Sequence, residues 1–206
     1  CKPYNGVSSM IFRKVHWVHF VGIGGIGMSG IAELLLNLGF KVTGSDMNRS
    51  DNVTRIRKLG IDVAIGHDPS NVGNADVLVY SSAVPAENPE IVRARQKGIS
   101  IIKRAEMLGE LINVKPTSIA VGGTHGKTST SSMIGMILSS AKKDPTLVVG
   151  GLVHTLDTNA KLGAGEIIVV EADEFDRSFL SLKPTIAIVT NIELEHTDCY
   201  ESLADL

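Results

Sequence analysis

The feature that most constrains the fold of this chain is a repeated alternation of short β-branched runs with helical patterns. An apolar run at 15–21 precedes a helical pattern at 28–39, and similar pairs continue to a last apolar run at 185–190. Parallel strands need a crossover of helical length between them, so this alternation predicts βαβ units. We therefore expect an α/β protein built on parallel sheets.

An interruption of this alternation predicts two domains. A helical pattern at 105–114 ends at Lys115-Pro116, and a new buried run begins at 118. Because proline restricts its predecessor to extended backbone, we place the boundary near 113–116. The predicted organisation is an N-terminal extension at 1–14, a Rossmann-like domain at 15–114 and a second α/β domain at 117–206. The second domain is expected to be truncated, since domains of this kind commonly use about 100–200 residues.

Charge and hydropathy exclude several classes of function. The 206 residues carry 20 Lys and Arg against 22 Asp and Glu, a net charge of −2. This charge gives no chain-wide basic field for nucleic acid or an anionic membrane, so we expect neither partner. No apolar run reaches the ~18–20 residues of a membrane helix, and the opening residues lack a signal-peptide pattern. We expect a cytoplasmic protein without membrane insertion, and its oligomeric state stays open.

The first glycine loop is Gly-Ile-Gly-Gly-Ile-Gly at 22–27, directly between a strand pattern and a helix pattern. Such glycines let the backbone turn tightly and approach a pyrophosphate, which rests on N–H groups at the helix N-terminus. Asp46 ends the next predicted strand, at 41–46, where it can meet a ribose or another hydroxyl group. The loop therefore predicts a ligand that contains a diphosphate, and a tight turn without a ligand is the alternative.

The second glycine loop is Gly-Gly-Thr-His-Gly-Lys-Thr at 122–128, again between a strand and a helix. Successive N–H groups would cradle an anion, Lys127 would reach the β- and γ-phosphates, and the Thr128 hydroxyl can ligate Mg²⁺. The general P-loop pattern has a glycine where this chain has Val121. Despite that departure, the loop predicts nucleotide binding in a truncated P-loop ATPase-type α/β domain.

Polar segments follow two further predicted strands of the second domain. Glu171 opens an acidic segment after one strand, and the segment 191–200 follows another. Because the carboxyl ends of strands face the ligand crevice of an open α/β sheet, Glu171 is a candidate Mg²⁺ ligand beside Thr128. A solvated loop is the alternative interpretation of this acidic segment.

Several linked motifs resemble the Mur ligases of peptidoglycan synthesis. In chain order they are HFVGIGGIGMSGIAE, GSD, YSSAVP, IKRAEMLGEL, GGTHGKTST, VVEADEFDRSFL and TNIELEHTDCY. Members of this family have an N-terminal Rossmann-like domain for a UDP-sugar, a central ATPase domain and a C-terminal Rossmann-like domain. The resemblance covers the first of these and about half of the second. The chain departs from the family at Glu195, where the family usually has Asp.

The resemblance implies an ATP-dependent, amide-bond-forming ligase that works through an acyl phosphate. It implies UDP-N-acetylmuramate and L-alanine as substrates, with ATP and Mg²⁺ as cofactors. Lys127 and His125 are the implied catalytic residues, and His125 has a loop-shaping role as its alternative. Thr128, Glu171 and His196 would place Mg²⁺.

The resemblance also implies two sets of binding residues. The ATP-binding set is Gly123, Thr124, Gly126, Lys127, Thr128 and Ser129. The UDP-sugar-binding set is Gly22, Gly24, Gly25, Ile26, Gly27, Ser45, Asp46, His67, Ser81, Ser82 and Ala83.

Three other functions stay open at this point. A family member that recycles a muropeptide tripeptide would share these motifs, and its amino-acid specificity would lie outside this chain. An NAD-dependent oxidoreductase would explain the loop at 22–27 with Asp46 but not the second loop. A non-catalytic UDP-sugar-binding module is the third alternative, and the isolated chain is expected to have no ligase activity.

Overall fold

The computed structural model describes residues 14–153, 158–173, 175–193 and 200–202. The chain forms two compact units that divide between Met107 and Leu108. This division lies inside the helix α4 (Arg104–Ile112), ahead of the predicted boundary region at 113–116. Each unit contains its own mainly parallel sheet, so the predicted α/β fold class is confirmed.

The first unit is built on a parallel sheet with the strand order β3-β2-β1-β4-β5. Its strands are β1 (Trp17–Val21), β2 (Lys41–Asp46), β3 (Asp62–Ile65), β4 (Val77–Tyr80) and β5 (Ser100–Lys103). Because β1 lies between β2 and β4, the chain winds first to one side of β1 and then to the other. The carboxyl end of β1 is therefore the switch point at which open α/β sheets bind ligands.

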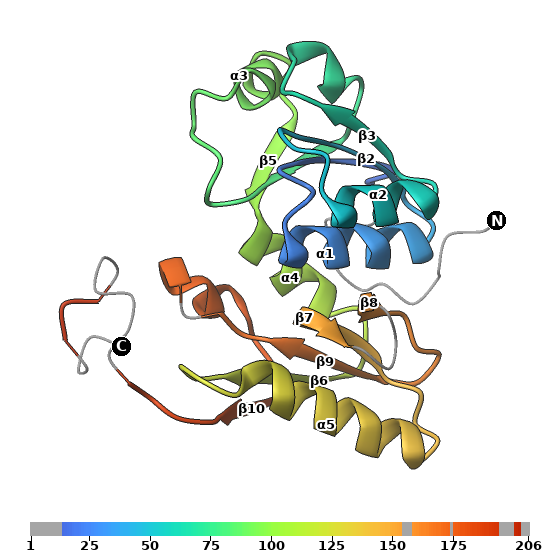
Figure 1. The fold of residues 1–206 in the computed structure, drawn as a ribbon, viewed down its shortest axis with the longest axis vertical. Coiled ribbons are helices and arrows are strands. Elements are labelled where there is room, and N and C mark those ends of the chain that lie inside the picture. The colour runs from blue at the N-terminus through green and yellow to red at the C-terminus, as the bar shows by residue number, and fades with distance from the viewer. Residues whose placement is uncertain (1–13, 154–157, 174, 194–199, 203–206) are drawn as a thin grey trace. The chain divides into compact units, whose positions relative to one another are not determined.

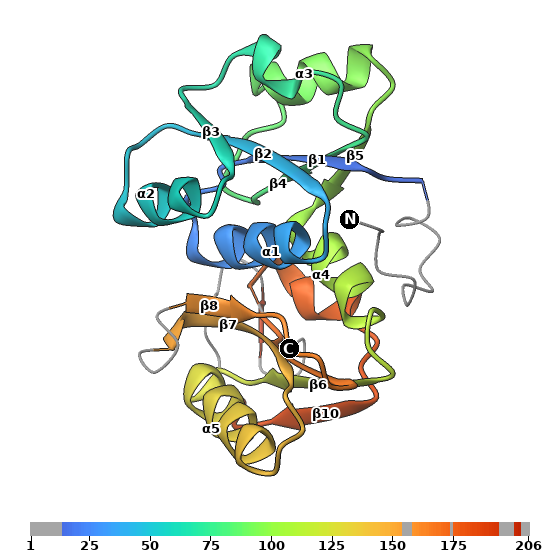
Figure 2. The ribbon, with the colours of Figure 1, turned by 90° about the vertical axis from the view of Figure 1, so that its right-hand side faces the viewer.

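Helices cover both faces of this first sheet, as Figure 2 shows. The helices α1 (Ile26–Asn37) and α2 (Asp51–Lys58) lie on one face. The helix α3 (Pro89–Gln96) and the 3-10 helix η1 (Pro69–Val72) lie on the other. On the α3 side the buried core residues are Val21, Val72, Leu78, Ile91 and Ala94. Burying an aliphatic side chain of this kind stabilises the fold by about 1.5–3 kcal/mol.

The second unit contains a sheet with the strand order β10-β6-β9-β7-β8. Its strands are β6 (Thr117–Gly122), β7 (Thr146–Val153), β8 (Thr158–Lys161), β9 (Ile167–Glu171) and β10 (Ile186–Val189). The order places β6 between β9 and β10, with parallel pairing on both sides. The two polar segments singled out in the sequence thus follow the two neighbours of the strand that leads into the second glycine loop.

The helix α5 (Lys127–Ser140) packs on one face of this second sheet (Figure 1). Its Ile134 and Leu138 contact a core of Ile119, Val121, Leu147 and Val169. A second 3-10 helix, η2 (Phe175–Ser181), follows β9. No helix in the described ranges is long and apolar enough to span a membrane.

Helix α1 and strand β8 differ from the sequence-based expectation. Helix α1 begins at Ile26 rather than at 28, so the last two residues of the first glycine loop already belong to the helix. Strand β8 has no counterpart in the prediction, and it pairs with β7 in the antiparallel direction. Its sequence, Thr-Asn-Ala-Lys, lacks the apolar run by which the other strands are recognised.

Candidate nucleotide-binding loops

The first glycine loop joins β1 to α1 and is fixed by residues at the end of β2. The N–H groups of Gly22 and Ile23 donate to the carbonyl oxygen of Ser45 at 2.9 and 3.1 Å. The N–H of Gly24 donates to Asp46 Oδ2 at 2.7 Å. A Cβ atom on Gly24 would lie only 2.6 Å from the same carboxylate oxygen, so glycine is required for this close approach.

The outer part of this loop presents a helix N-terminus. Gly25 and Ile26 are exposed, and α1 has neither a side-chain cap nor an acidic residue in its first turn. The N-terminus of a helix carries a partial positive charge and N–H groups without intrahelical partners. The exposed N-terminus of α1 is therefore a candidate site for an anionic group such as a diphosphate.

The segment after β4 lies against the same loop. A Cβ atom on Gly22 would be 3.3 Å from Val84 Cγ2 and 3.6 Å from Ser81 Cβ. Ser82 and Ala83 are exposed. The structure therefore brings the predicted residues of this segment next to the predicted diphosphate loop.

Two other predicted UDP-sugar residues have a different environment. The Ser45 side chain is fully buried, and its hydroxyl lies 3.0 Å from His67 Nδ1. The same hydroxyl donates to Glu90 Oε2 at 2.8 Å. Ser45 therefore contacts the loop through its backbone carbonyl, whereas its side chain belongs to a buried polar cluster. His67 is partly exposed at the edge of that cluster.

The second glycine loop joins β6 to α5. Gly123 has φ +124°, and a Cβ atom there would collide with the Thr190 hydroxyl and lie 2.8 Å from the carbonyl oxygen of Asn191. Gly126 is the N-cap of α5 and adopts a left-handed conformation with φ +81°. Ser129 is exposed in the first turn of the helix. Glycines at these positions let the backbone curl around an anion.

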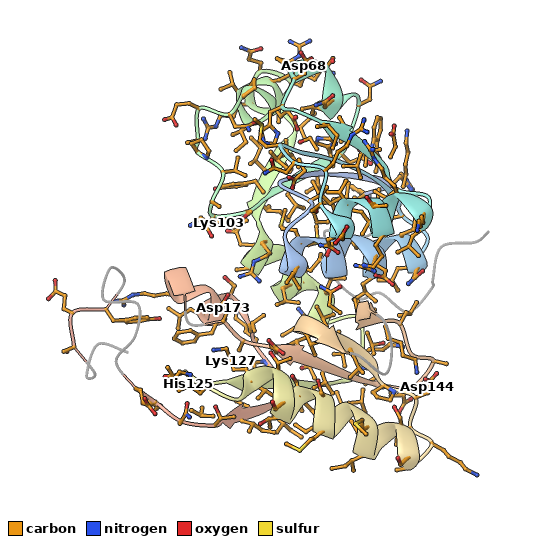
Figure 3. All side chains as sticks on the ribbon, in the orientation of Figure 1. Asp68, Lys103, His125, Lys127, Asp144 and Asp173 are labelled. Carbon is orange, nitrogen blue, oxygen red and sulfur yellow. The ribbon has the colours of Figure 1, made fainter. Side chains whose placement is uncertain are left out.

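Lys127 is the first residue of α5, and its ammonium group folds back onto the loop. Nζ donates to the carbonyl oxygens of Gly123 at 2.6 Å and Thr124 at 3.2 Å. Figure 3 shows Lys127 and His125 at the start of α5. The lysine charge is therefore held over the loop in which the phosphates of a nucleotide would lie.

The segment after β10 holds the backbone of this loop in place. The N–H of His125 donates to Asn191 Oδ1 at 2.8 Å, and the Thr190 hydroxyl donates to the carbonyl of His125 at 2.6 Å. The N–H of Glu193 donates to Thr124 Oγ1 at 2.9 Å. The His125 ring itself is more than half exposed, with Nε2 3.8 Å from Glu193 Oε2. The imidazole is therefore open to a substrate on the solvent side.

Glu171 ends β9 directly beside the second loop. It lies opposite Val121 in the register of β9 with β6. Its Oε1 atom is 3.1 Å from the Ser131 hydroxyl of α5, and that hydroxyl also lies 3.3 Å from the carbonyl oxygen of Thr128. A carboxylate thus lies next to the helical turn that carries the Thr128 hydroxyl.

These residues fit the donor set expected for Mg²⁺. The ion prefers oxygen ligands, retains several waters and binds through one or two carboxylates together with substrate phosphates. Within the described part of the chain, no three His, Cys, Asp or Glu side chains gather into a ready-made metal site. The predicted ligand His196 and its neighbour Glu195 lie outside the described residues.

A largely apolar cavity of about 370 Å³ opens beside the second loop. Gly123, Thr124 and Asn191 form its polar margin, and the rest is lined mainly by aliphatic and aromatic side chains. Among these are Phe179, Leu182, Ile188 and Ile192. The space next to the phosphate loop therefore suits an apolar or flat chemical group.

Several residues that contact the two loops, or the residues holding them, were not identified from the sequence. Asn52 donates from Nδ2 to the carbonyl of Gly24 at 2.7 Å and to the Ser29 hydroxyl at 2.8 Å. Ser131 contacts Glu171, and Glu90 binds Ser45. A polar residue inside a helical pattern gives no signal of its long-range partner, because that partner depends on how the strands are ordered.

Comparison with protein families assigns the two loops to two domains of one family. The catalytic-domain description of the Mur ligase family matches residues 17–116, and the Mur ligase middle-domain description matches residues 121–206. The chain belongs to the Mur ligase family.

Particular members of the family can be named as relatives. The UDP-N-acetylmuramate--L-alanine ligase of Myxococcus xanthus is 58% identical over 194 residues, which cover 94% of this chain and 41% of that protein. The ligase of the same name from Geotalea daltonii is 53% identical over 196 residues, covering 95% and 43%. This chain thus spans less than half the length of these curated relatives.

Solved structures agree with this assignment. The crystal structure of UDP-N-acetylmuramate-alanine ligase from Thermotoga maritima matches with a TM-score of 0.85 and 35% identity, covering 91% of this chain and 44% of that one. The UDP-N-acetylmuramate:L-alanyl-gamma-D-glutamyl-meso-diaminopimelate ligase of Neisseria meningitides matches with a TM-score of 0.84 and 28% identity, covering 92% and 64%.

Proposed function

We propose that this chain holds the UDP-sugar-binding domain and part of the ATP-binding domain of an enzyme that joins L-alanine to UDP-N-acetylmuramate. The observation that carries the proposal is the pairing of a diphosphate-type loop and a lysine-bearing phosphate loop in one chain whose relatives carry that name. A dinucleotide oxidoreductase would need the first loop but not the second. The predicted domain limits of 15–114 and 117–206 are part of this proposal.

The first unit would bind the sugar nucleotide. Its diphosphate would rest on the N-terminus of α1 at Gly25, Ile26 and Gly27, where the positive end of the helix dipole favours an anion, and Gly24 would shape the loop through its bond to Asp46. Asp46 would hold the loop through its bond to Gly24, and the exposed Ser82 and Ala83 would line the same site. These residues would form the diphosphate part of the proposed UDP-N-acetylmuramate site.

The second unit would bind ATP and Mg²⁺. A carboxylate is a poor acyl donor, so the muramate carboxylate would take the γ-phosphoryl group of ATP, with ADP leaving, to give an acyl phosphate. The amine of L-alanine would then attack the carbonyl carbon, forming the amide bond and releasing inorganic phosphate and a proton. Lys127 would place a positive charge on the transferring phosphoryl group. Thr128 and Glu171 would supply oxygen atoms to the ion, with His196 as a further predicted ligand. His125 would face the substrate side of the loop.

A second candidate is the ligation of a preformed peptide to the same UDP-sugar. The Neisseria relative carries the name of such a ligase and has almost the same TM-score as the Thermotoga structure. Both activities use the same two loops, so the described residues favour neither. The higher identity to the L-alanine ligases puts the first candidate ahead.

The test of binding uses the 206-residue chain itself. Calorimetric titration with UDP-N-acetylmuramate should show saturable binding, whereas NADH should show none. Binding of NADH in preference to the UDP-sugar would replace the proposal with an oxidoreductase function.

The test of activity uses a full-length form of the protein that carries this sequence. Incubation with ATP, Mg²⁺ and UDP-N-acetylmuramate should yield an amide product with L-alanine. Product formation only with the tripeptide L-alanyl-γ-D-glutamyl-meso-diaminopimelate would instead select the second candidate.

A further inference from the structure

A single buried carboxylate binds several polar groups near the carboxyl ends of the strands in the first sheet, where we place the sugar nucleotide. Glu90, the second residue of α3, is fully buried. Its Oε2 atom accepts hydrogen bonds from His19 Nε2 and Ser45 Oγ, both at 2.8 Å. Its Oε1 atom accepts from Asn71 Nδ2 at 2.9 Å and from the N–H of Asp68 at 3.2 Å. One side chain thus links β1, β2, α3 and the segment after β3.

His67 is the member of this cluster that reaches the surface. Its Nδ1 atom lies 3.0 Å from Ser45 Oγ and 3.3 Å from Glu90 Oε1, and its side chain is 15% exposed against 0% for Glu90. His67 follows β3 by two residues, at the carboxyl edge where Asp46 also ends its strand. The ring therefore connects the buried carboxylate to the predicted ligand site.

The hydrogen bonds determine which nitrogen of His67 carries a proton. The Ser45 hydroxyl has one proton, which it donates to Glu90 Oε2, so its oxygen can only accept from His67. The Glu90 carboxylate also can only accept. Nδ1 must therefore carry the hydrogen, and in the neutral ring Nε2 has a free lone pair. Nε2 makes no hydrogen bond to any residue in the described ranges.

The Glu90 carboxyl group is ionised at neutral pH. Its burial raises the pKa of the carboxyl group, but the hydrogen bonds from His19, Asn71 and Ser45 outweigh burial and hold the pKa below its usual value. An ionised acceptor orients a histidine more firmly than a neutral one, because hydrogen bonds to a charged group are stronger.

We propose that Glu90 is a positioning residue for the sugar-nucleotide site. Through Ser45 it fixes the end of β2 that holds the glycine loop, and through His67 it presents Nε2 as a hydrogen-bond acceptor to an O–H or N–H group of the nucleotide. The inference rests on the proposed UDP-sugar site. It adds to that site a positioning residue on α3, outside the glycine loops. Orienting partners of this kind typically change affinity about 10–100-fold where a histidine binds a metal, and we expect the lower end of that range here.

The test is a double-mutant cycle on UDP binding, measured by calorimetry on the 206-residue chain at pH 8, where an unperturbed imidazole is neutral. Glu90→Gln should weaken UDP binding about 10-fold. In a chain that already carries His67→Ala, the same substitution should cost clearly less affinity than in the unmodified chain, because only the route through Ser45 remains. Equal losses with and without His67, or no loss at all, would overturn the proposal.

A matched control separates positioning from general stability. Asp76 is another carboxylate of the first unit. It accepts hydrogen bonds from the N–H groups of His16 and Trp17 at the amino ends of β1 and β4. Asp76→Asn should lower the melting temperature and leave the UDP affinity unchanged. If Asp76→Asn weakens UDP binding as much as Glu90→Gln does, the Glu90 effect is general destabilisation and the proposal fails.

A measurement without any variant covers the case in which Glu90→Gln does not fold. Long-range ¹H–¹⁵N spectra of the unmodified chain should show His67 protonated at Nδ1, and UDP should shift its Nε2 signal. Protonation at Nε2 alone, or an Nε2 signal unchanged at saturating UDP, would contradict the inference. Absence of any UDP binding by the unmodified chain would instead overturn the proposed sugar-nucleotide function itself.

Discussion

The hydroxyl of Ser131 on α5 lies 3.1 Å from Glu171 Oε1 at the end of β9, although 40 residues separate the two along the chain. The same hydroxyl is 2.7 Å from the carbonyl oxygen of Lys127. Glu171 is therefore held against the helix that starts with the phosphate-binding lysine. This contact gives the carboxylate a fixed position relative to Thr128, as a shared metal site would require.

Glu171→Gln should weaken the binding of Mn²⁺ in the presence of ATP by about 10-fold or more, because a ligating carboxylate loses its charge. Ser131→Ala should weaken it less, since the hydroxyl only orients Glu171. Electron paramagnetic resonance of free Mn²⁺ measures both affinities. Asp144→Asn, which removes an exposed carboxylate paired with Lys161, is the control and should leave Mn²⁺ affinity unchanged. Equal affinities for Glu171→Gln and the unmodified chain would remove Glu171 from the metal site.

Lys127→Ala should lower the turnover number of the full-length form by about 10²–10³, by analogy with the loss of one preorganised charge or hydrogen-bond donor. UDP affinity should stay the same, because the two glycine loops belong to different compact units. Steady-state kinetics with ATP and a separate UDP titration provide the two numbers. An unchanged turnover number would show that the second loop is not the ATP site.

Gly24→Ala should abolish tight UDP binding and destabilise the first unit by about 1–3 kcal/mol, because the added Cβ would overlap the Asp46 carboxylate. Gly25→Ala is the matched variant for stability. Its Cβ would meet no atom closer than 3.7 Å, so its melting temperature should stay near that of the unmodified chain. Thermal unfolding of the two variants makes the comparison, and equal melting temperatures would contradict the required close approach at Gly24.

The stability contributed by Asp76 should depend on pH. Hydrogen bonds from the N–H groups of His16 and Trp17 lower the pKa of this carboxyl group below its usual value. The contribution is therefore complete above the unfolded-state pKa and is lost as the pH falls through the lower folded-state value. Because the group is exposed, solvent screening limits its contribution to about 1 kcal/mol or less.

Urea unfolding of the unmodified chain and of Asp76→Asn measures this contribution. The difference in the free energy of unfolding should be constant from pH 7 down to about pH 5 and should shrink below about pH 4. A difference that grows on acidification would mean that the aspartate does not stabilise the fold in its charged form.

The sequence by itself determined the local parts of this protein. Apolar runs followed by helical patterns gave the parallel strands, since the periods of 2 and 3.6 residues are properties of the backbone. The loops at 22–27 and 122–128 were identified because glycine at a strand-to-helix turn has few purely structural explanations. Glu171 was placed at a strand end for the same local reason, and β6 and β9 are indeed neighbours.

Only the tertiary structure decided which side chains meet. His19 and Glu90 are 71 residues apart, and their contact depends on the strand order β3-β2-β1-β4-β5, which no local pattern encodes. The burial of the Ser45 side chain and the antiparallel pairing of β8 were hidden for the same reason. Periodicity fixes which face of an element is apolar, whereas the partner of a buried polar group is set by the register and packing of distant segments.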